Sequence, residues 1–215
     1  MRSRPGKVHL KSTPEQLRLH GLLLDEAPAC GHLDLAEIFG NSRPVEVEVG
    51  PGKGTFLLRR AAQRPEINLL ALEWLGSYAA YAADRALRAG LKNVRVLCAD
   101  AAAVFTSALP DSSVQRVYIY FPDPWPKRKH HRRRLITVPF LTQVRRVLRL
   151  GGWLGIVTDH TGYFRQIRMA VGAVDGLTPV EFHQGPGEGL IGSNFERKYA
   201  AAGRTLLATA AIRRR

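Results

Sequence analysis

Residues Glu46-Val47-Glu48-Val49-Gly50-Pro51-Gly52-Lys53-Gly54 lead from a short apolar run into three closely spaced glycines, and this stretch decides the fold. Glycines at such a turn let the backbone approach a ligand and leave the first N–H groups of the next helix free. A phosphate-binding loop needs Ser or Thr directly after Gly-Lys, and a dinucleotide site needs a wider glycine spacing, so neither motif matches. The carboxylate of Glu48 would repel a pyrophosphate and suits an ammonium or sulfonium ligand. A purely structural tight turn is the alternative.

Outward from this turn, short β-rich runs alternate with longer helical ones. Such alternation predicts an α/β fold with a mostly parallel sheet and helices on both faces. A last apolar segment, 205–212, is expected to be an antiparallel edge strand. The strands buried on both faces are expected at 45–49, 67–72, 94–98, 114–120 and 153–157, and the helices at 54–63, 78–89 and 135–149, the last stopped by Gly151-Gly152.

Two further acids stand at strand ends. Glu73 ends the second expected strand and Asp100 follows the third. Because the carboxyl ends of parallel strands meet at one edge of a sheet, both acids are expected beside the glycine turn. The first could accept both hydroxyls of a ribose and the second an adenine amine, which together describe a nucleoside site. Alternatively, each acid caps the helix that follows it, as Asp100 could do before three alanines.

A second informative stretch runs from Tyr118 to Arg134 and joins an apolar strand, a carboxylate between prolines, and a dense cationic run. The strand delivers Asp123 to the same edge, where the prolines restrict the backbone. The cations beyond it suit phosphates. Trp125 could stack on a base or act as a packing wedge. A solvated loop that is basic by chance is the alternative for the cationic run.

Composition indicates one globular domain and a polyanionic partner. The 215 residues suffice for one domain with a sizeable core. We expect a basic N-terminal arm at 1–43, which touches RNA or covers the sheet, and a main domain at 44–215. The net charge of +14 favours nucleic acid. No apolar run is long enough for a membrane span. Two unpaired cysteines, both expected in the core, fit a reducing cytoplasm.

These motifs, taken in order, resemble the tRNA (guanine-N7)-methyltransferases over roughly Pro44 to Arg204. The most specific element is the Pro-Asp-Pro-Trp-Pro-Lys segment with its basic continuation. The matching elements are the glycine turn with Glu48, Glu73, Asp100, Phe121-Pro122-Asp123-Pro124-Trp125-Pro126-Lys127, the basic run, Thr158-Asp159, and Ser193-Asn194-Phe195-Glu196. Two positions depart from the family pattern, namely Ser193, where the family usually carries Thr, and His160.

The resemblance implies a Rossmann-like class I fold with a seven-stranded sheet, S-adenosylmethionine as cofactor, and no metal. It implies methylation of N7 of a guanosine in tRNA, at position 46 of the variable loop, by a cytoplasmic monomer or homodimer that binds no membrane. Asp123 would be catalytic. The cofactor would contact Glu48, Gly50, Gly52, Gly54, Glu73, Asp100 and Asp123; the target guanosine would contact Lys127, Asp159, Ser193, Asn194, Phe195 and Glu196; and the tRNA would contact Lys129, His130, His131, Arg132, Arg133 and Arg134.

The expected chemistry needs little acid–base work, because guanine N7 carries a lone pair and no proton. Catalysis would then come mainly from positioning, which is worth up to about 7–11 kcal/mol in favourable cases. Two other functions stay open from the sequence: a noncatalytic RNA-binding module on the same fold, and an enzyme of this class with a small-molecule or protein substrate. The three strand-end acids disfavour the first, and the cationic run disfavours the second.

Overall fold

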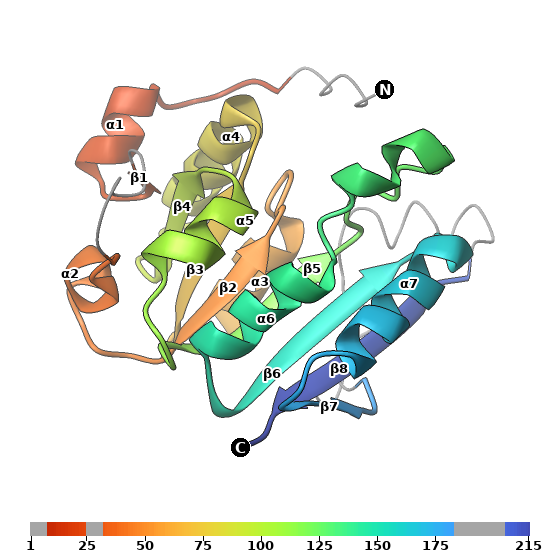
Figure 1. Cartoon of the computed structure of the whole chain (residues 1–215). Coiled ribbons are helices and arrows are strands. Elements are labelled where there is room, and N and C mark those ends of the chain that lie inside the picture. Colours follow the sequence, from red (N-terminus) through yellow and green to blue (C-terminus); the bar gives the residue numbers. More distant parts are fainter. Residues whose placement is uncertain (1–7, 25–31, 183–204) are drawn as a thin grey trace.

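The fold is built on one sheet, seen in a computed structural model that describes residues 8–24, 32–182 and 205–215. Within these residues the sheet has eight strands in the order β1-β4-β3-β2-β5-β6-β8-β7 (Figure 1). Val- and Leu-rich runs buried on both faces form its centre, as is typical of parallel strands. The strands are β1 (Leu23–Leu24), β2 (Val45–Val49), β3 (Asn68–Glu73), β4 (Val94–Cys98), β5 (Val114–Tyr120), β6 (Leu148–Thr158), β7 (Leu177–Val180) and β8 (Leu207–Arg213).

Helices cover both faces of the sheet. α1, α3 and α4 lie on one face, and α2, α5, α6 and α7 lie on the other (Figure 1). The predicted α/β architecture is therefore confirmed. The helices are α1 (Pro14–Leu19), α2 (Leu35–Phe39), α3 (Thr55–Gln63), α4 (Gly76–Arg88), α5 (Ala101–Ala103), the π-helical turn η1 (Val104–Ala108), the 3-10 helix η2 (Arg128–Arg133), α6 (Val138–Val147) and α7 (Thr161–Gly172).

Strand order corrects two expectations. Strands β1 to β6 pair in parallel, whereas β8 pairs antiparallel with both β6 and β7. The segment expected at the edge is thus interior, and β7 is the edge strand. Pro179 lies in β7 and has no N–H to donate, and proline is tolerated in edge strands for this reason. The count rises from seven to eight because the two-residue β1 pairs with β4.

The described part of the N-terminal stretch covers the sheet, which is one of the two roles considered from the sequence. Leu17, Leu22 and Leu23 are buried in the core cluster on the α4 face. Just before α1, the backbone N–H groups of Lys11 and Ser12 donate to the buried carboxylate of Asp84 in α4, at 3.2 and 2.9 Å. These contacts attach the stretch to α4.

Helix α6 is shorter than the 135–149 expected, and β6 is longer. The Thr137 side chain caps the helix, and Pro139 occupies its first turn, so the helix begins at Val138. At its other end β6 starts at once with Leu148 and continues through the two glycines, with a register shift against β5. The glycine pair therefore lies inside a strand, and does not stop the helix as predicted.

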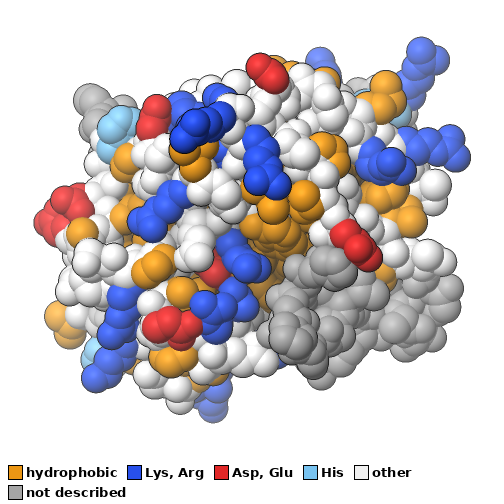
Figure 2. Space-filling view, turned by 90° about the horizontal axis from the view of Figure 1, so that it is seen from below, with side chains coloured by type: hydrophobic (Ala, Val, Ile, Leu, Met, Phe, Trp, Pro, Cys, Tyr) orange, Lys and Arg blue, Asp and Glu red, His pale blue; other side chains and the backbone are white. Residues whose placement is uncertain are grey.

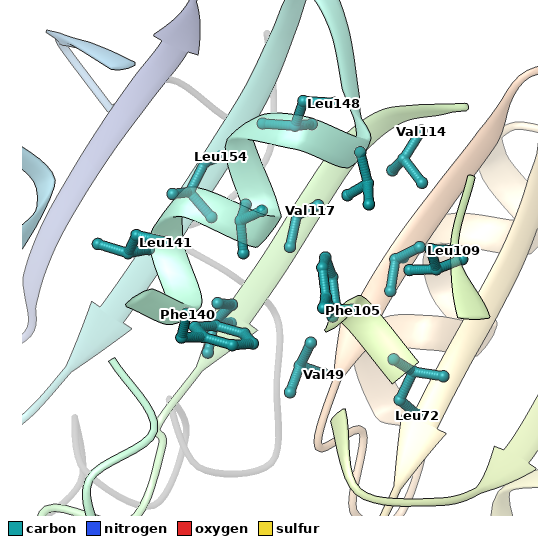
Figure 3. Close-up of a cluster of buried hydrophobic side chains, with 14 of the residues drawn as sticks. Val49, Leu72, Phe105, Leu109, Val114, Val117, Phe140, Leu141, Leu148 and Leu154 are labelled. Carbon is teal, nitrogen blue, oxygen red and sulfur yellow. The ribbon is translucent and has the colours of Figure 1, made fainter. Parts of the chain in front are cut away.

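The largest core cluster fills the space between the sheet and α6. Figure 3 shows Phe105 of η1 facing Phe140 of α6, with Val117 of β5 beside them. The two phenyl rings meet edge to face, with centroids 5.4 Å apart. Burial of each such side chain is worth about 1.5–3 kcal/mol, so this cluster anchors η1 and α6 against the strands that carry the site.

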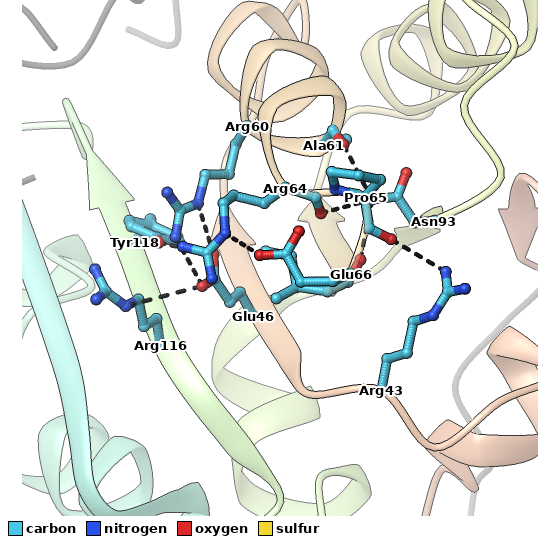
Figure 4. Close-up of polar contacts among 11 residues, drawn as sticks. Arg43, Glu46, Arg60, Ala61, Arg64, Pro65, Glu66, Asn93, Arg116 and Tyr118 are labelled. Carbon is cyan, nitrogen blue, oxygen red and sulfur yellow. Dashed lines mark hydrogen bonds and ion pairs between the residues drawn. The ribbon is translucent and has the colours of Figure 1, made fainter. Parts of the chain in front are cut away.

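A buried ionic network ties α3 to the sheet on the opposite face (Figure 4). Arg60 of α3 donates to both carboxylate oxygens of Glu46 in β2, each at 2.9 Å. The Tyr118 hydroxyl of β5 donates to the same carboxylate at 2.8 Å, and Arg116 lies 3.8 Å from it. Glu46 is two residues before Glu48, so the network fixes the middle of α3 to the strand that leads into the glycine turn.

Candidate active site at the carboxyl edge of the sheet

The glycine turn between β2 and α3 has three residues in the left-handed region. Gly50, Gly52 and Gly54 have φ of 71°, 55° and 73°. A Cβ at Gly54 would lie 2.9 Å from Leu58 Cδ1 and 3.1 Å from Ala82 Cβ, so this glycine is required by helix packing. Among the described residues, and apart from the immediate chain neighbours, no heavy atom lies within 4 Å of a Cβ built at Gly50 or Gly52. The turn therefore leaves open space at these two positions, as a ligand-binding turn would.

Glu73 is joined directly to this turn. Its Oε2 accepts the backbone N–H of Gly52 at 3.0 Å, and its Oε1 accepts that of Leu75 at 2.9 Å. The side chain is 7% exposed. Burial raises the pKa of Glu73, and the negative charge of Asp123 adds to this rise, while the backbone donors oppose it. The predicted convergence of the strand-end acids on the glycine turn is thus observed for Glu73, with Asp123 close enough to interact with it.

Glu48 is the most deeply buried acid of the site. It is 3% exposed, and no hydrogen-bond partner is found for its Oε2 among the described residues. Burial, together with repulsion from Glu73, raises the pKa of Glu48 to about 8. A buried carboxylate oxygen without a partner is costly unless a donor or a positive charge arrives. Glu48 and Glu73 together therefore favour a ligand that carries a cationic group.

Asp123 lies on a strained segment at the end of β5. Phe121 and Trp125 have φ of 53° and 42°, which costs about 1–3 kcal/mol for each non-glycine residue and persists only when neighbours hold it. The Phe121 N–H donates to the Val157 carbonyl at 2.8 Å, which fixes one end. The Asp123 side chain is exposed. One end of the segment that carries this exposed carboxylate is thus fixed to β6.

Trp125 acts as a packing wedge, which is one of its two predicted roles. It is 8% exposed. The guanidinium of Arg133 lies over its ring at 4.3 Å from the centroid, and the His130 ring is 5.9 Å away. Both sit on η2, so the indole joins the Asp123 segment to the cationic run. Its buried ring leaves little surface for stacking on a base.

Asp100 follows β4 and caps α5, the alternative role considered from the sequence. Its Oδ1 accepts the Ala102 N–H at 2.8 Å. Its contact with the cofactor stays a prediction.

Sequence reasoning missed Trp74, whose side chain is 53% exposed directly after Glu73. A large aromatic residue next to a strand-end acid was the available signal, since its flat apolar face suits a nucleobase. Cys98, expected in the core, is exposed at the end of β4.

The cationic run forms η2, and its members divide into two groups. Lys127, Lys129, Arg132 and Arg133 are exposed, and His130 and His131 are partly exposed. Partial desolvation and the neighbouring Arg133 charge lower the pKa of His130. Arg134 is different, because it is 6% exposed and its guanidinium is bonded within the protein. Its burial contradicts the prediction that it contacts RNA.

Asp159 and His160 follow β6 at the same edge of the sheet. Asp159 is partly buried. The His160 Nδ1 accepts the Tyr163 N–H at 3.0 Å and caps α7, so this departure from the family pattern has a structural role. The predicted guanosine contacts Ser193, Asn194, Phe195 and Glu196 lie outside the described residues.

The fold and the carboxylate-lined glycine turn define a class: the chain is a Rossmann-like class I methyltransferase that uses S-adenosylmethionine. A family model described as "Putative methyltransferase" matches residues 42–208. Among solved structures, the 16S rRNA methyltransferase KamB is 17% identical with a TM-score of 0.63, covering 86% of this chain and 95% of that one. The antibiotic-resistance methyltransferase Kmr is 19% identical with a TM-score of 0.58, covering 83% and 91%. At these identities the likeness shows the fold alone.

Curated relatives identify the family within that class. A tRNA (guanine-N(7)-)-methyltransferase of Streptococcus thermophilus is 32% identical over 199 residues, which is 91% of this chain and 93% of that protein. One of Geobacillus thermodenitrificans is 33% identical over 180 residues, or 82% and 83%. The chain therefore belongs to the tRNA (guanine-N7)-methyltransferase family, and the resemblance noted in its sequence is confirmed. In the described residues no helix has the length and apolar character needed to cross a membrane.

Proposed function

We propose that this enzyme methylates N7 of a guanosine in the variable loop of tRNA, by in-line transfer from S-adenosylmethionine without a general base. The observation that carries the proposal is the placement of Glu48, Glu73 and Asp123 at the carboxyl ends of the neighbouring strands β2, β3 and β5, with Glu73 bonded to the glycine turn. The names of the curated relatives support guanosine as the nucleoside and N7 as the atom that accepts the methyl group.

The residues at the glycine turn fit the cofactor. The open space at Gly50 and Gly52 gives room for close approach of a ligand to the backbone. Glu73, already oriented by two backbone N–H groups, retains acceptor capacity for ribose hydroxyls. The unpartnered Oε2 of Glu48 suits the positive end of the ligand. When bound, the cofactor would supply a methyl group on a sulfonium sulfur, and Glu48 would bind a positively charged group of this ligand.

Asp123 and Asp159 would hold the guanine. A carboxylate can accept the N1–H and the amino group of guanine together, and it stabilises the positive charge that the base gains on N7 methylation. Guanine N7 has no proton to lose, so no residue needs to act as a base. Ser193 and Glu196 belong to the same proposal. We also place the enzyme in the cytoplasm, where tRNA is modified, as an expectation from its proposed substrate.

The exposed cations of η2 would bind tRNA phosphates. Lys129 and Arg132 are exposed, and no ion pair with an acidic residue is found for either among the described residues. Lys and Arg side chains also outnumber Asp and Glu on the face seen from below in Figure 2. Because η2 follows Asp123 by only a few residues, a tRNA bound there would have its target base near the carboxylates.

The proposal is tested with purified protein, labelled S-adenosylmethionine and unmodified tRNA transcripts. We expect label in one variable-loop guanosine. The matched control is the same tRNA with 7-deazaguanosine at that position, which keeps the Watson–Crick edge but lacks N7. It should bind with similar affinity and accept no methyl group. Label on the control tRNA, or at a guanosine outside the variable loop, would contradict the proposal.

A further inference from the structure

Arg134 closes the cationic run but faces the protein interior. Its Nε donates to the Pro124 carbonyl at 2.8 Å, and its Nη1 donates to Oε1 of Gln166 in α7 at 2.6 Å. Its guanidinium also lies over the Tyr163 ring, 4.8 Å from the centroid. The three contacts engage three sides of one planar group. Such a fork is geometry that a guanidinium provides and an ammonium does not.

The partners of Arg134 are themselves fixed. Tyr163 is fully buried in α7, and its hydroxyl oxygen accepts the Ile136 N–H at 3.0 Å. The Gln166 amide donates to the Ile136 carbonyl at 3.2 Å. Residues 134 and 136 are therefore both held by one turn of α7. This arrangement forms a rigid base on which the carbonyl of Pro124 is placed.

The segment on the other side of the Arg134–Pro124 bond has few backbone donors. Pro122 and Pro124 have no N–H to donate, and Phe121 and Trp125 at its ends have left-handed backbone angles. The Phe121 N–H bond to Val157 fixes the first end, and the Arg134 bond to Pro124 fixes the carbonyl one residue after Asp123. Arg134 therefore holds the backbone next to Asp123, between the Phe121 bond on one side and the packing of Trp125 on the other.

We propose that Arg134 is a positioning residue that holds Asp123 in place through the Pro124 carbonyl and links that carboxylate to η2. This inference rests on the role proposed above for Asp123. Binding of tRNA to the exposed residues of η2 would then affect the orientation of the Asp123 carboxylate through Arg134. In the sequence Arg134 is the last residue of the cationic run, but in the structure its guanidinium is buried and contacts only the protein.

The test compares Arg134→Ala with Arg132→Ala, a neighbouring arginine that is exposed. We expect Arg134→Ala to lower kcat roughly 10- to 100-fold, the cost of a small misplacement of a reacting group. Its KM for tRNA and its Kd for S-adenosylmethionine should stay within about twofold. Arg132→Ala should raise KM for tRNA and leave kcat within about twofold. Added guanidinium ion should restore part of the activity of Arg134→Ala and none of that of Arg132→Ala.

The conservative variant Arg134→Lys keeps the charge and one donor, so its kcat should lie between those of the parent and Arg134→Ala. If Arg134→Ala does not fold, Arg134→Lys and Gln166→Leu carry the same expectation of a lowered kcat at an unchanged KM. A raised KM for tRNA with an unchanged kcat in these variants would overturn the inference. An Asp123→Ala enzyme with the parental kcat would instead reject the proposed role of Asp123, whatever the Arg134 variants do.

Discussion

The backbone N–H of Gly52 donates to Oε2 of Glu73 at 3.0 Å, so the glycine turn after β2 and the acid at the end of β3 form one unit. The other carboxylate oxygen is held by the N–H of Leu75. The carboxylate is thus oriented before any ligand arrives, which reduces the ordering cost of binding. It follows that a change at Glu73 affects the backbone of the turn as well as the contact with the ligand.

We expect Glu73→Ala to weaken S-adenosylmethionine binding by about 1.5–3 kcal/mol, the range for hydrogen bonds to a charged group. Glu73→Gln should lose less, because its amide oxygen can still accept the Gly52 N–H. Isothermal titration calorimetry measures both affinities. Glu66→Ala is the control, since this exposed acid pairs with Arg64 away from the site. Unchanged affinity in a folded Glu73→Ala protein would contradict the assignment.

Glu48 should make stability and cofactor affinity depend on pH. Its pKa in the folded protein, about 8, is above the ordinary value of 4.5, so the folded state holds a proton that the unfolded state releases. The contribution of Glu48 to the free energy of unfolding, without cofactor, should then be largest below pH 4.5. It should fall as the pH rises toward 8, by at most about 1.4 kcal/mol per pH unit.

Cofactor binding should show the opposite trend. A cationic ligand favours the ionised carboxylate, so the affinity for S-adenosylmethionine should increase up to about pH 8, with release of a proton from Glu48 on binding. Calorimetry in two buffers of different ionisation enthalpy measures that proton. Glu48→Gln is the isosteric control and should remove both the pH dependence and the proton release. Equal proton release by parent and variant would show that another group titrates.

The Glu46 network should matter for stability and not for chemistry. Arg60→Ala would leave Glu46, which is 1% exposed, with a buried charge and weaker partners, and we expect a loss of about 3–5 kcal/mol in the free energy of unfolding. Urea denaturation measures this loss. The double variant Glu46→Leu/Arg60→Leu should lose less than Arg60→Ala, because it leaves no uncompensated acid. A single variant as stable as the parent would show that the pair contributes nothing.

The sequence predicts the centre of this fold well because periodicity and strand-end acids are local signals. Expected strands 45–49, 94–98 and 114–120 coincide with β2, β4 and β5. The sequence does not predict the strand pairings that depend on tertiary contacts. The pairing of β1 with β4 needs only two residues, and the interior place of β8 depends on an edge strand that contains proline. Neither leaves a pattern long enough to recognise.

The same limit applies to the site. The acids of the glycine turn were found because parallel topology brings strand ends together. Arg134 could not be separated from its basic neighbours by sequence, since burial in a run of cations is set by packing on Tyr163 and Gln166. His160 was noted as a departure, but its role as a helix cap depends on the geometry of α7.

The salt dependence of tRNA binding should reveal which cations of η2 meet phosphates. Arg133 stacks on Trp125 and Arg134 is buried, so Lys129 and Arg132 are the cleanest pair to remove. Each neutralised phosphate contributes about 0.7 to 0.9 to the slope of log affinity against log salt. We expect Lys129→Ala/Arg132→Ala to lower tRNA affinity and flatten this slope by about 1.4 to 1.8, with unchanged affinity for S-adenosylmethionine.

The matched control for this pair is Lys92→Ala/Arg214→Ala. Lys92 precedes β4 and Arg214 follows the antiparallel β8, so both exposed cations lie at the opposite edge of the sheet. The control removes the same net charge, and at that distance its effect on the slope should be small because salt screens exposed charges beyond about 8–10 Å. Filter binding at several salt concentrations measures both slopes. Equal slopes in the two double variants would mean that η2 is a solvated surface and that the tRNA phosphates lie elsewhere on the enzyme.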